Sequence, residues 1–428
     1  MDEDPSEEEL REASLLLGSG RRSDDAAEDY SGKVNEVLGS GAYQRAACVT
    51  CGLGVAAGST EVMAIGLAIP MIEAEFGAGD WERNLVASCI FLGMLLGGLI
   101  SGVLGDLYGR KTCMTFFTAV IAVFGGLTAI AGSLWQVACF RFLAGLGIGG
   151  NIPAIFSYVA ETTHSRGRGQ YMTFVASHWM LGSVVTAAIG WIILPHDVAI
   201  PLIGLSGWRA YFLVCIAPAV LLCALASLVL VESPCFLIRR RKFGAAAAAL
   251  ETIATANGEG GSPALAALVR QLNRHELDHE AGAAGGEGEG EALALGLRTT
   301  FALIRDLLRQ RETRKLTIVL GTVWFCLSAC WYGFMIWIPQ FLQSKHDDVY
   351  LGNLVTSAGD LPGNVISFLI IERQGRKRTL LCSLAAASLS PIAFAAAPKV
   401  RNQLNLLSTP RPIPSHLPQS MMDHHNVT

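Results

Sequence analysis

The sequence predicts an all-α membrane protein, with a complete six-helix bundle first and three further helices after it. Apolar side chains make up 51% of the 428 residues and charged ones only 16%, whereas soluble domains carry about 25% charged residues. The apolar residues fall into blocks of about 20, the length that crosses a hydrocarbon core of ~30 Å. Because backbone groups in lipid must be hydrogen-bonded within their own segment, these blocks are predicted to be helices.

Nine such blocks follow one another along the chain, and each is close to the length that a tilted membrane helix needs. A long polar segment separates the sixth block from the seventh, which divides the spans into six and three. The predicted spans are Cys48–Ile72, Asn84–Val103, Thr112–Ala131, Gln136–Val159, Tyr171–Leu194, Arg209–Val231, Leu316–Leu342, Tyr350–Ile371 and Thr379–Ala397.

Basic residues gather in alternate loops. The loops after the second, fourth, sixth and eighth spans carry pairs or runs of Arg and Lys, of which Arg239–Lys242 is the longest, while the other loops hold almost none. Loops rich in Arg and Lys stay on the cytoplasmic side of a membrane. The N-terminus is therefore predicted to be cytoplasmic.

The polar segments are predicted to lie outside the membrane. Residues 1–41 are mostly polar and acidic and resemble a disordered tail, in which Glu12–Leu17 resembles an acidic dileucine signal for endosomal or vacuolar membranes. Phe243–Ala256 and Thr300–Arg314 are predicted helices, and Ala281–Glu291 is predicted to be a flexible linker. The predicted division is 1–41 (cytoplasmic tail), 42–238 (six-helix bundle), 239–315 (cytoplasmic linker), 316–397 (partial second bundle) and 398–428 (second disordered tail).

The loop between the second and third spans has an echo later in the chain. Gly102–Lys111 contains an acid, spaced glycines and an Arg-Lys pair. Glu372–Lys377 repeats the end of this pattern, and its Gly375 lies 266 residues after Gly109. Two similar loops at that separation predict a duplicated bundle whose halves run in parallel. Since only three spans make up the second half, we expect it to be truncated.

Several ionisable or aromatic side chains fall inside predicted spans. A charge at the centre of a membrane helix costs at least ~2.5–3.5 kcal/mol, so the presence of each charged residue there must be explained. A central cavity that binds a charged solute or carries a proton is one reason, and a buried pair or a hydrogen bond between helices is the alternative. Aromatic rings on the seventh span could stack on a cationic or aromatic solute. The candidates for solute binding or proton coupling are Glu61, Arg141, His178, Trp331, Tyr332 and Asp360.

Asp106, Arg110 and Lys111 lie at the predicted cytoplasmic edge, where charge costs little. Arg110 is predicted to pair with Glu161 at the inner end of the fourth span. Such a charge-assisted contact would form a gate if it existed in only one conformation. The alternative is that these charges set the topology alone.

The pattern Gly102-x-x-x-Asp106-x-x-Gly109-Arg110-Lys111 resembles the loop signature of the major facilitator superfamily. Glu232-Ser233-Pro234 resembles the motif that sugar porters and organic-ion transporters carry after the sixth span, although Cys235 replaces the usual Arg. Gly149–Tyr158 and His178–Gly182 resemble synaptic vesicle glycoprotein 2 and its related proteins. The resemblance implies a major facilitator fold and a cytoplasmic gate formed by Gly102, Asp106, Gly109, Arg110, Lys111, Glu161, Glu372 and Arg376.

These observations predict a secondary active or facilitative transporter, for example a symporter, that moves a small organic solute by alternating access. An organic ion is the expected solute, with a proton as the expected coupling ion. The net charge of −4 gives no case for a nucleic-acid partner, and nothing in the sequence implies enzymatic activity, a cofactor or a metal. The alternative is a truncated, non-transporting membrane isoform with a regulatory or structural role. In either case the protein is expected in the plasma membrane or in an endomembrane or vesicle.

Overall fold

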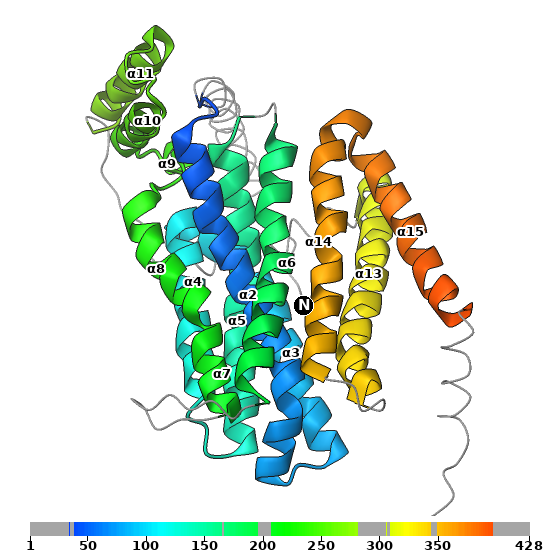
Figure 1. Ribbon diagram of the computed structural model, residues 1–428. Coiled ribbons are helices and arrows are strands. Elements are labelled where there is room, and N and C mark those ends of the chain that lie inside the picture. Colours follow the sequence, from blue (N-terminus) through cyan, green and yellow to red (C-terminus); the bar gives the residue numbers. More distant parts are fainter. Residues whose placement is uncertain are drawn as a thin grey trace, which may run out of the picture. The chain divides into compact units, whose positions relative to one another are not determined.

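The structure is a computed structural model that describes residues 34, 38–164, 167–195, 207–280, 305, 309–343 and 349–396. The side chains at 275–280, 334–343, 372, 376 and 390–396 are outside this description. Every regular element within these ranges is a helix (Figure 1). The chain falls into two compact units, Met1–Phe368 and Leu369–Thr428.

Eight helices in the described part of the chain are long and apolar enough to cross a membrane. They match eight of the nine predicted spans to within a few residues at most ends. The ninth predicted span coincides with α15 (Arg376–Ala396), so the division into six and three spans remains a prediction. The eight are α2 (Ala42–Phe76), α3 (Asp80–Tyr108), α4 (Arg110–Thr128), α5 (Leu134–Thr162), α6 (Arg168–Ile193), the pair α7 (Gly207–Cys215) and α8 (Ala217–Val229), α13 (Arg311–Gln343) and α14 (Val349–Gln374).

The sixth span is broken in the middle, which the apolar pattern does not reveal. Helix α7 ends at Cys215 and α8 begins at Ala217, with Pro218 in its first turn. Proline has no N–H to donate, and its ring clashes with the carbonyl four residues earlier, which interrupts the helix there. The break falls next to the centre of the bundle described below.

Helices α3 and α5 pack closely because glycines line their contact. A Cβ atom added at Gly145 would lie 2.1 Å from the carbonyl oxygen of Ile90, and one at Gly149 would lie 2.0 Å from that of Met94. Small residues spaced by four let helix backbones approach in this way in membranes. The close approach of α3 and α5 therefore depends on these glycines.

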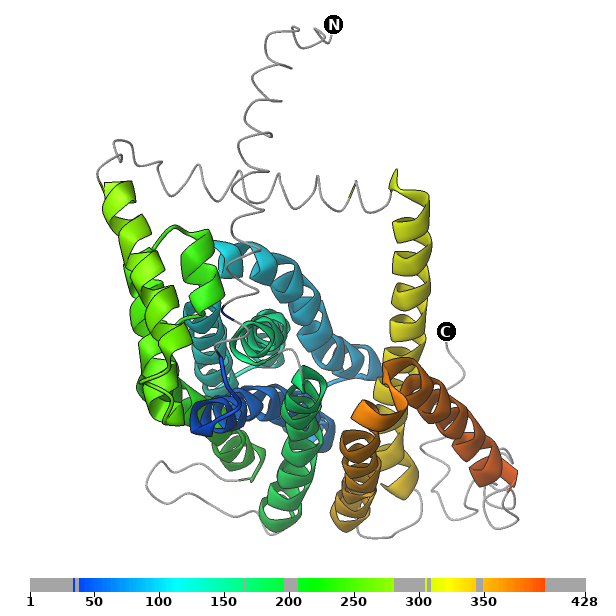
Figure 2. The same ribbon diagram turned by 90° about the horizontal axis from the view of Figure 1, so that it is seen from above.

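Three further helices lie at one side of one end of the bundle: α9 (Pro234–Arg239), α10 (Phe243–Asn257) and α11 (Pro263–Glu280) (Figures 1 and 2). The predicted alanine-rich helix is α10. Phe236, Leu250 and Leu268 join the same buried apolar cluster as residues of α2, α5 and α8. Leu38, within the predicted N-terminal tail, is also buried in this cluster.

Several predicted segments fall outside the described residues. The linker at Ala281–Glu291, the tail at 398–428 and the dileucine pattern at Glu12–Leu17 lie there completely, and the helix predicted at Thr300–Arg314 lies there in part.

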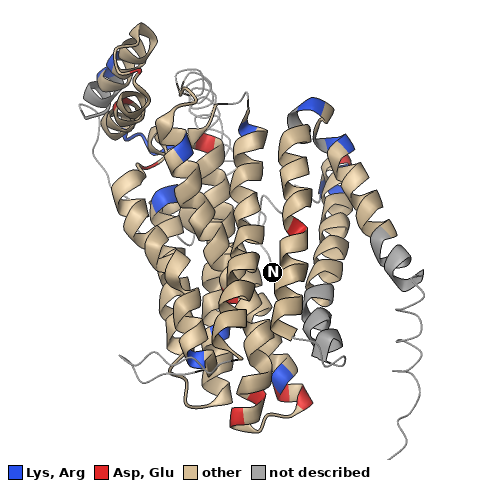
Figure 3. Cartoon of the chain, in the orientation of Figure 1, with Lys and Arg blue, Asp and Glu red and all other residues tan. Residues whose placement is uncertain are grey.

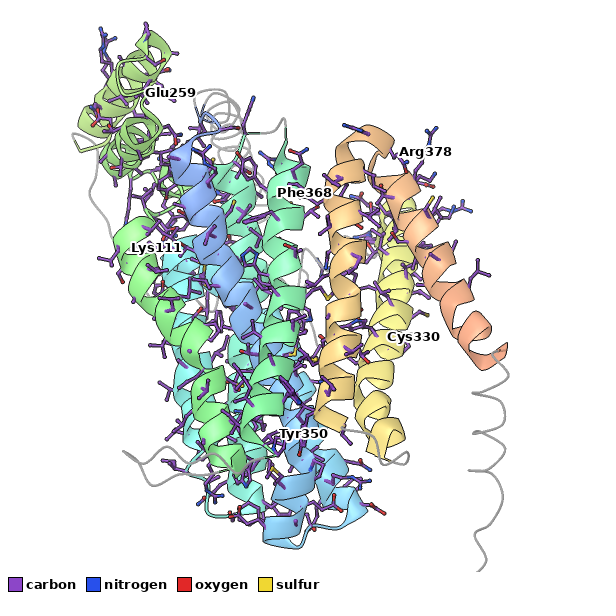
Figure 4. All side chains as sticks on the ribbon, viewed as in Figure 1. Lys111, Glu259, Cys330, Tyr350, Phe368 and Arg378 are labelled. Carbon is purple, nitrogen blue, oxygen red and sulfur yellow. The ribbon has the colours of Figure 1, made fainter. Side chains whose placement is uncertain are left out.

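The two ends of the six-helix bundle differ in charge. Lys and Arg are more frequent toward the end that carries α10 and α11, whereas Asp and Glu gather where α2 ends and α3 begins, together with Arg83 and Arg209 (Figure 3). Lys111 lies toward the first end and Tyr350 toward the second (Figure 4). Tyr350 packs on the apolar cluster of that second end, which contains Trp208 and Phe212.

The second unit contains the end of α14 and helix α15, joined at Gly375 with φ +80°. Gly109, between α3 and α4, also has a positive φ, of +103°. Glycine adopts this backbone conformation readily because it has no Cβ. The two similar loops predicted from the sequence thus share a helix–glycine–helix turn.

Candidate functional site

The centre of the bundle holds a buried ion pair between Glu61 of α2 and Arg141 of α5. The Nη1 atom of Arg141 lies 2.6 Å from Oε2 of Glu61, and both side chains are 0% exposed. The second carboxylate oxygen, Oε1, is buried and accepts no hydrogen bond in the structure. The two residues predicted separately as site candidates are therefore brought together as a pair.

Residues of α4 and α7 surround this pair and contact it. Thr128 of α4 accepts hydrogen bonds from Nε and Nη2 of Arg141 at 3.1 and 2.7 Å. The guanidinium group lies over the ring of Phe212 in α7, 4.7 Å from its centre, where a cation–π attraction adds to the ion pair. A Cβ atom at Gly125 would lie 2.6 Å from Oε1 of Glu61. This glycine therefore leaves the space that the unpartnered oxygen occupies.

The predicted aromatic residues of α13 belong to a ring cluster. Trp331 packs edge-on against Trp179 of α6 with ring centres 6.3 Å apart, and Tyr332 against Phe91 of α3 at 4.8 Å. Trp179 also lies close to Gly58, one turn before Glu61 in α2. Trp179 belongs to the sequence motif His178–Gly182, but only the ring contacts show that it is part of this cluster.

Asp360 and His178 are the other predicted site residues, and neither joins the ion pair. Asp360 lies half-buried in α14, and its Oδ2 atom is buried without a hydrogen-bond partner. His178 of α6 forms a hydrogen bond through Nδ1 with the carbonyl oxygen of Phe174, at 2.9 Å. Its ring packs against α2, where a Cβ at Gly52 would lie 2.6 Å away. His178 is thus held by its own helix and by packing.

A second polar cluster lies at the end of the bundle near α9, around Arg110 at the start of α4. Arg110 forms ion pairs with Asp106 at 2.8 Å and with Glu161 at 3.2 Å, and its side chain is only 9% exposed. It also donates to the carbonyl oxygen of Gly105. The predicted contact between Arg110 and Glu161 is present and joins α4 to α5.

Residues after the sixth span extend this cluster. Arg239 of α9 reaches Glu161 at 2.6 Å, and Ser233 donates a hydrogen bond to the same carboxylate. We refer to Arg110, Asp106, Glu161, Ser233 and Arg239 as the inner-end network.

Glu232 caps the first turn of α4. Its Oε1 atom accepts hydrogen bonds from the backbone N–H groups of Arg110 at 2.8 Å and Lys111 at 3.0 Å. A carboxylate at this position satisfies unpaired donors and complements the positive end of the helix dipole. A Cβ at Gly109 would lie 2.3 Å from Glu232, so glycine is needed here for space as well as for its positive φ.

Glu232, Ser233 and Arg239 were not predicted as site residues. The Glu-Ser-Pro motif indicates that these positions have a function, but the sequence does not show that they contact the loop at Gly109–Lys111, more than 100 residues earlier. Two other predicted gate residues contribute no side-chain contact to the inner-end network. Gly102 is exposed, with open space around it, and Lys111 contributes only its backbone N–H group, which donates to Glu232. The side chains of Glu372 and Arg376 lie outside the described residues.

Comparison with known proteins decides the family. Residues 51–408 match the family described as "Sugar (and other) transporter". The chain belongs to this transporter family. It is therefore a multi-pass membrane protein of a family of transporters rather than of enzymes.

Proteins similar to this chain include synaptic vesicle glycoproteins. The chain is 27% identical to synaptic vesicle glycoprotein 2A of Bos taurus over 364 residues, which cover 82% of this chain and 48% of that protein. It is 25% identical to synaptic vesicle glycoprotein 2B of Mus musculus, covering 83% of this chain and 54% of that protein. The chain spans about half the length of the curated relatives that it matches.

A solved structure of similar fold is the xylose transporter XylE from E. coli in a partially occluded inward-open conformation. The TM-score is 0.58 with 18% sequence identity, over 79% of this chain and 75% of XylE. At this identity the likeness concerns the fold, which is that of the major facilitator superfamily. Together with the family match and the synaptic vesicle relatives, this fold confirms the resemblance noted from sequence motifs.

Proposed function

We propose that this protein is a secondary transporter that moves a small organic solute, an organic ion or a sugar, by alternating access. The observation that carries the proposal is the fully buried Glu61–Arg141 pair at the centre of a transporter-family bundle. Buried charges are costly in membranes and are found where ions, protons or charged solutes pass. The pair offers an acid that can change charge inside such a path.

Proton coupling is the role that we propose for Glu61. Its Oε1 atom accepts no hydrogen bond and lies in the space left by Gly125, so a proton can be added there without displacing a partner. Protonation would remove the charge that attracts Arg141 and weaken the contact between α2 and α5. A proton-dependent link between two helices of the bundle is what couples proton movement to a conformational change.

The solute is proposed to contact the aromatic rings of Trp331 and Tyr332, with Trp179 beside them. Rings of this kind favour cations or flat apolar surfaces. Asp360 has one buried oxygen without a partner, and it would add a negative charge that suits an organic cation. His178 is the weakest of the proposed contacts, because its Nδ1 atom already bonds to its own helix.

The inner-end network is proposed to act as the cytoplasmic gate. Its ion pairs join α4, α5 and α9 in the conformation described here. Contacts of this sort stabilise one state of a two-state transition and must break in the other. The basic character of this end supports a cytoplasmic N-terminus.

The test is uptake into vesicles that contain the purified full chain. Radiolabelled organic cations, organic anions and sugars would be compared, with and without an inward proton gradient. We expect one class to accumulate and the gradient to increase its accumulation. Glu61→Gln, which cannot change charge, is expected to abolish the effect of the gradient while leaving exchange of solute across the membrane. No uptake of any class by a correctly folded sample would contradict the proposal.

A further inference from the structure

The turn between α9 and α10 presents a run of basic side chains that the proposed transport mechanism does not use. Arg239, Arg240, Arg241 and Lys242 follow one another, and all four are exposed. Arg239 is paired with Glu161. The other three form no ion pair within the described part of the chain, which leaves three positive charges at one turn.

The backbone of this turn is closed by two hydrogen bonds. The N–H group of Lys242 donates to the carbonyl oxygen of Leu237, and that of Arg241 donates to Ile238, both at 2.9 Å. This pattern ends helices and usually has glycine at the residue that adopts a positive φ. Here that residue is Arg241, with φ 56°, the one non-glycine residue with positive φ in the described ranges. A residue with a Cβ is unfavourable there, so Arg241 holds its side chain at this turn with a strained backbone.

The turn is also held in a fixed place at the bundle end. Phe236, Leu237 and Ile238 of α9 are buried in the apolar cluster of that end. The ion pair from Arg239 to Glu161 ties the start of the turn to the inner end of α5, a predicted membrane span. The basic side chains therefore start next to the end of a helix that is long and apolar enough to cross a membrane.

We propose that Arg240, Arg241 and Lys242 form a docking surface for the anionic lipid headgroups of the membrane leaflet on this side. Clusters of Lys and Arg next to a membrane span attract phosphate-bearing and carboxylate-bearing lipids. Arginine matches a phosphate group with two parallel hydrogen bonds. Two carboxylates at this end of the bundle, Glu161 of the inner-end network and Glu232, are already occupied by Arg239, Arg110 and backbone N–H groups. Lipid phosphate is thus the complementary charge available at this surface.

The test uses the full chain in nanodiscs of phosphatidylcholine into which phosphatidylserine is titrated, with the melting temperature as the readout. Wild-type protein is expected to gain thermal stability as phosphatidylserine increases. The double variant Arg240→Gln/Lys242→Gln is expected to need about 25-fold more phosphatidylserine for the same gain, since each basic residue near an anionic surface contributes about fivefold. An unchanged response of this variant would overturn the proposal.

A matched control removes two charges from the same helical region but away from the turn. Arg270→Gln/Arg274→Gln changes exposed residues of α11 and is expected to keep the wild-type response. If this control lost the response as strongly, total charge rather than the turn would be responsible, and the proposal would fail. Inorganic phosphate that reproduced the full gain in pure phosphatidylcholine nanodiscs would likewise overturn the assignment to a lipid surface.

Arg241→Gly separates the lipid role from a structural one. Glycine fits a positive φ better than arginine, so the variant is expected to be at least as stable as wild type in phosphatidylcholine alone. Its response to phosphatidylserine is expected to weaken about fivefold. A lower melting temperature without phosphatidylserine would show that Arg241 supports the turn itself and would remove it from the proposed surface. This test is independent of transport, since uptake is not measured.

Discussion

Replacing Glu61 with glutamine tests whether the buried pair at the centre of the bundle is charged. In the structure Arg141 lies 2.6 Å from Glu61, and neither side chain is exposed. Removing one partner of a buried pair typically costs about 3–5 kcal/mol, because the other charge is left uncompensated. The glutamine oxygen can still accept one hydrogen bond, which returns about 1 kcal/mol. We therefore expect Glu61→Gln to destabilise the protein by about 2–4 kcal/mol.

The partner variant Arg141→Gln should behave differently with pH. The guanidinium group of Arg141 cannot lose its proton in a protein, whereas the carboxylate of Glu61 can gain one. Protonating a glutamate with an ordinary pKa of about 4.3 costs about 4 kcal/mol at pH 7 and about 1.4 kcal/mol less for each pH unit below that. Arg141→Gln should therefore become relatively more stable as the pH falls from 7 toward 5, while Glu61→Gln should not.

Both effects can be followed by intrinsic tryptophan fluorescence during heating of the detergent-solubilised protein. At about 1 °C per kcal/mol for a chain of 428 residues, Glu61→Gln should lower the melting temperature by roughly 2–4 °C. The double variant Glu61→Gln/Arg141→Gln should be less destabilised than the sum of the single ones, because it leaves no charge without a partner. A melting temperature of Glu61→Gln equal to that of wild type, together with additive single variants, would refute a charged pair.

Three further predictions use the same melting assay or the uptake assay. Glu232→Ala should cost about 1–2 kcal/mol, because the first turn of α4 loses its cap, while Glu251→Ala on the exposed face of α10 should cost almost nothing; equal losses would contradict the capping role. Gly149→Val should cost about 3 kcal/mol or more by forcing α3 and α5 apart, whereas Gly102→Val, with open space around it, should be tolerated. Trp331→Ala should weaken solute uptake about tenfold through a lost ring contact, and Trp324→Ala, 70% exposed on the same helix, should leave it unchanged.

Much of the fold can be read from local patterns. Eight of the predicted spans are present because lipid requires about 20 consecutive apolar residues with all backbone groups paired internally. The break near Pro218 was missed because an apolar run of normal length hides it. The contact of Arg110 with Glu161 is predictable because both residues lie at the same predicted edge of the membrane, but nothing in the sequence joins Glu232 and Arg239 to it. Their positions depend on how α9 folds back on the bundle, which no single segment reveals.

Membrane class, helix positions and family follow from the amino-acid order alone, because hydropathy and loop charge act on each segment separately. The sequence alone does not determine which charged residues of the membrane helices contact one another. Glu61 and Arg141 lie 80 residues apart, and each could have faced a solute path or a neighbouring helix. Packing of α2, α4, α5 and α7 around Gly125 and Thr128 makes them partners and leaves one carboxylate oxygen without a hydrogen bond. Such a pair exists only when several helices meet, and so only the assembled bundle decides it.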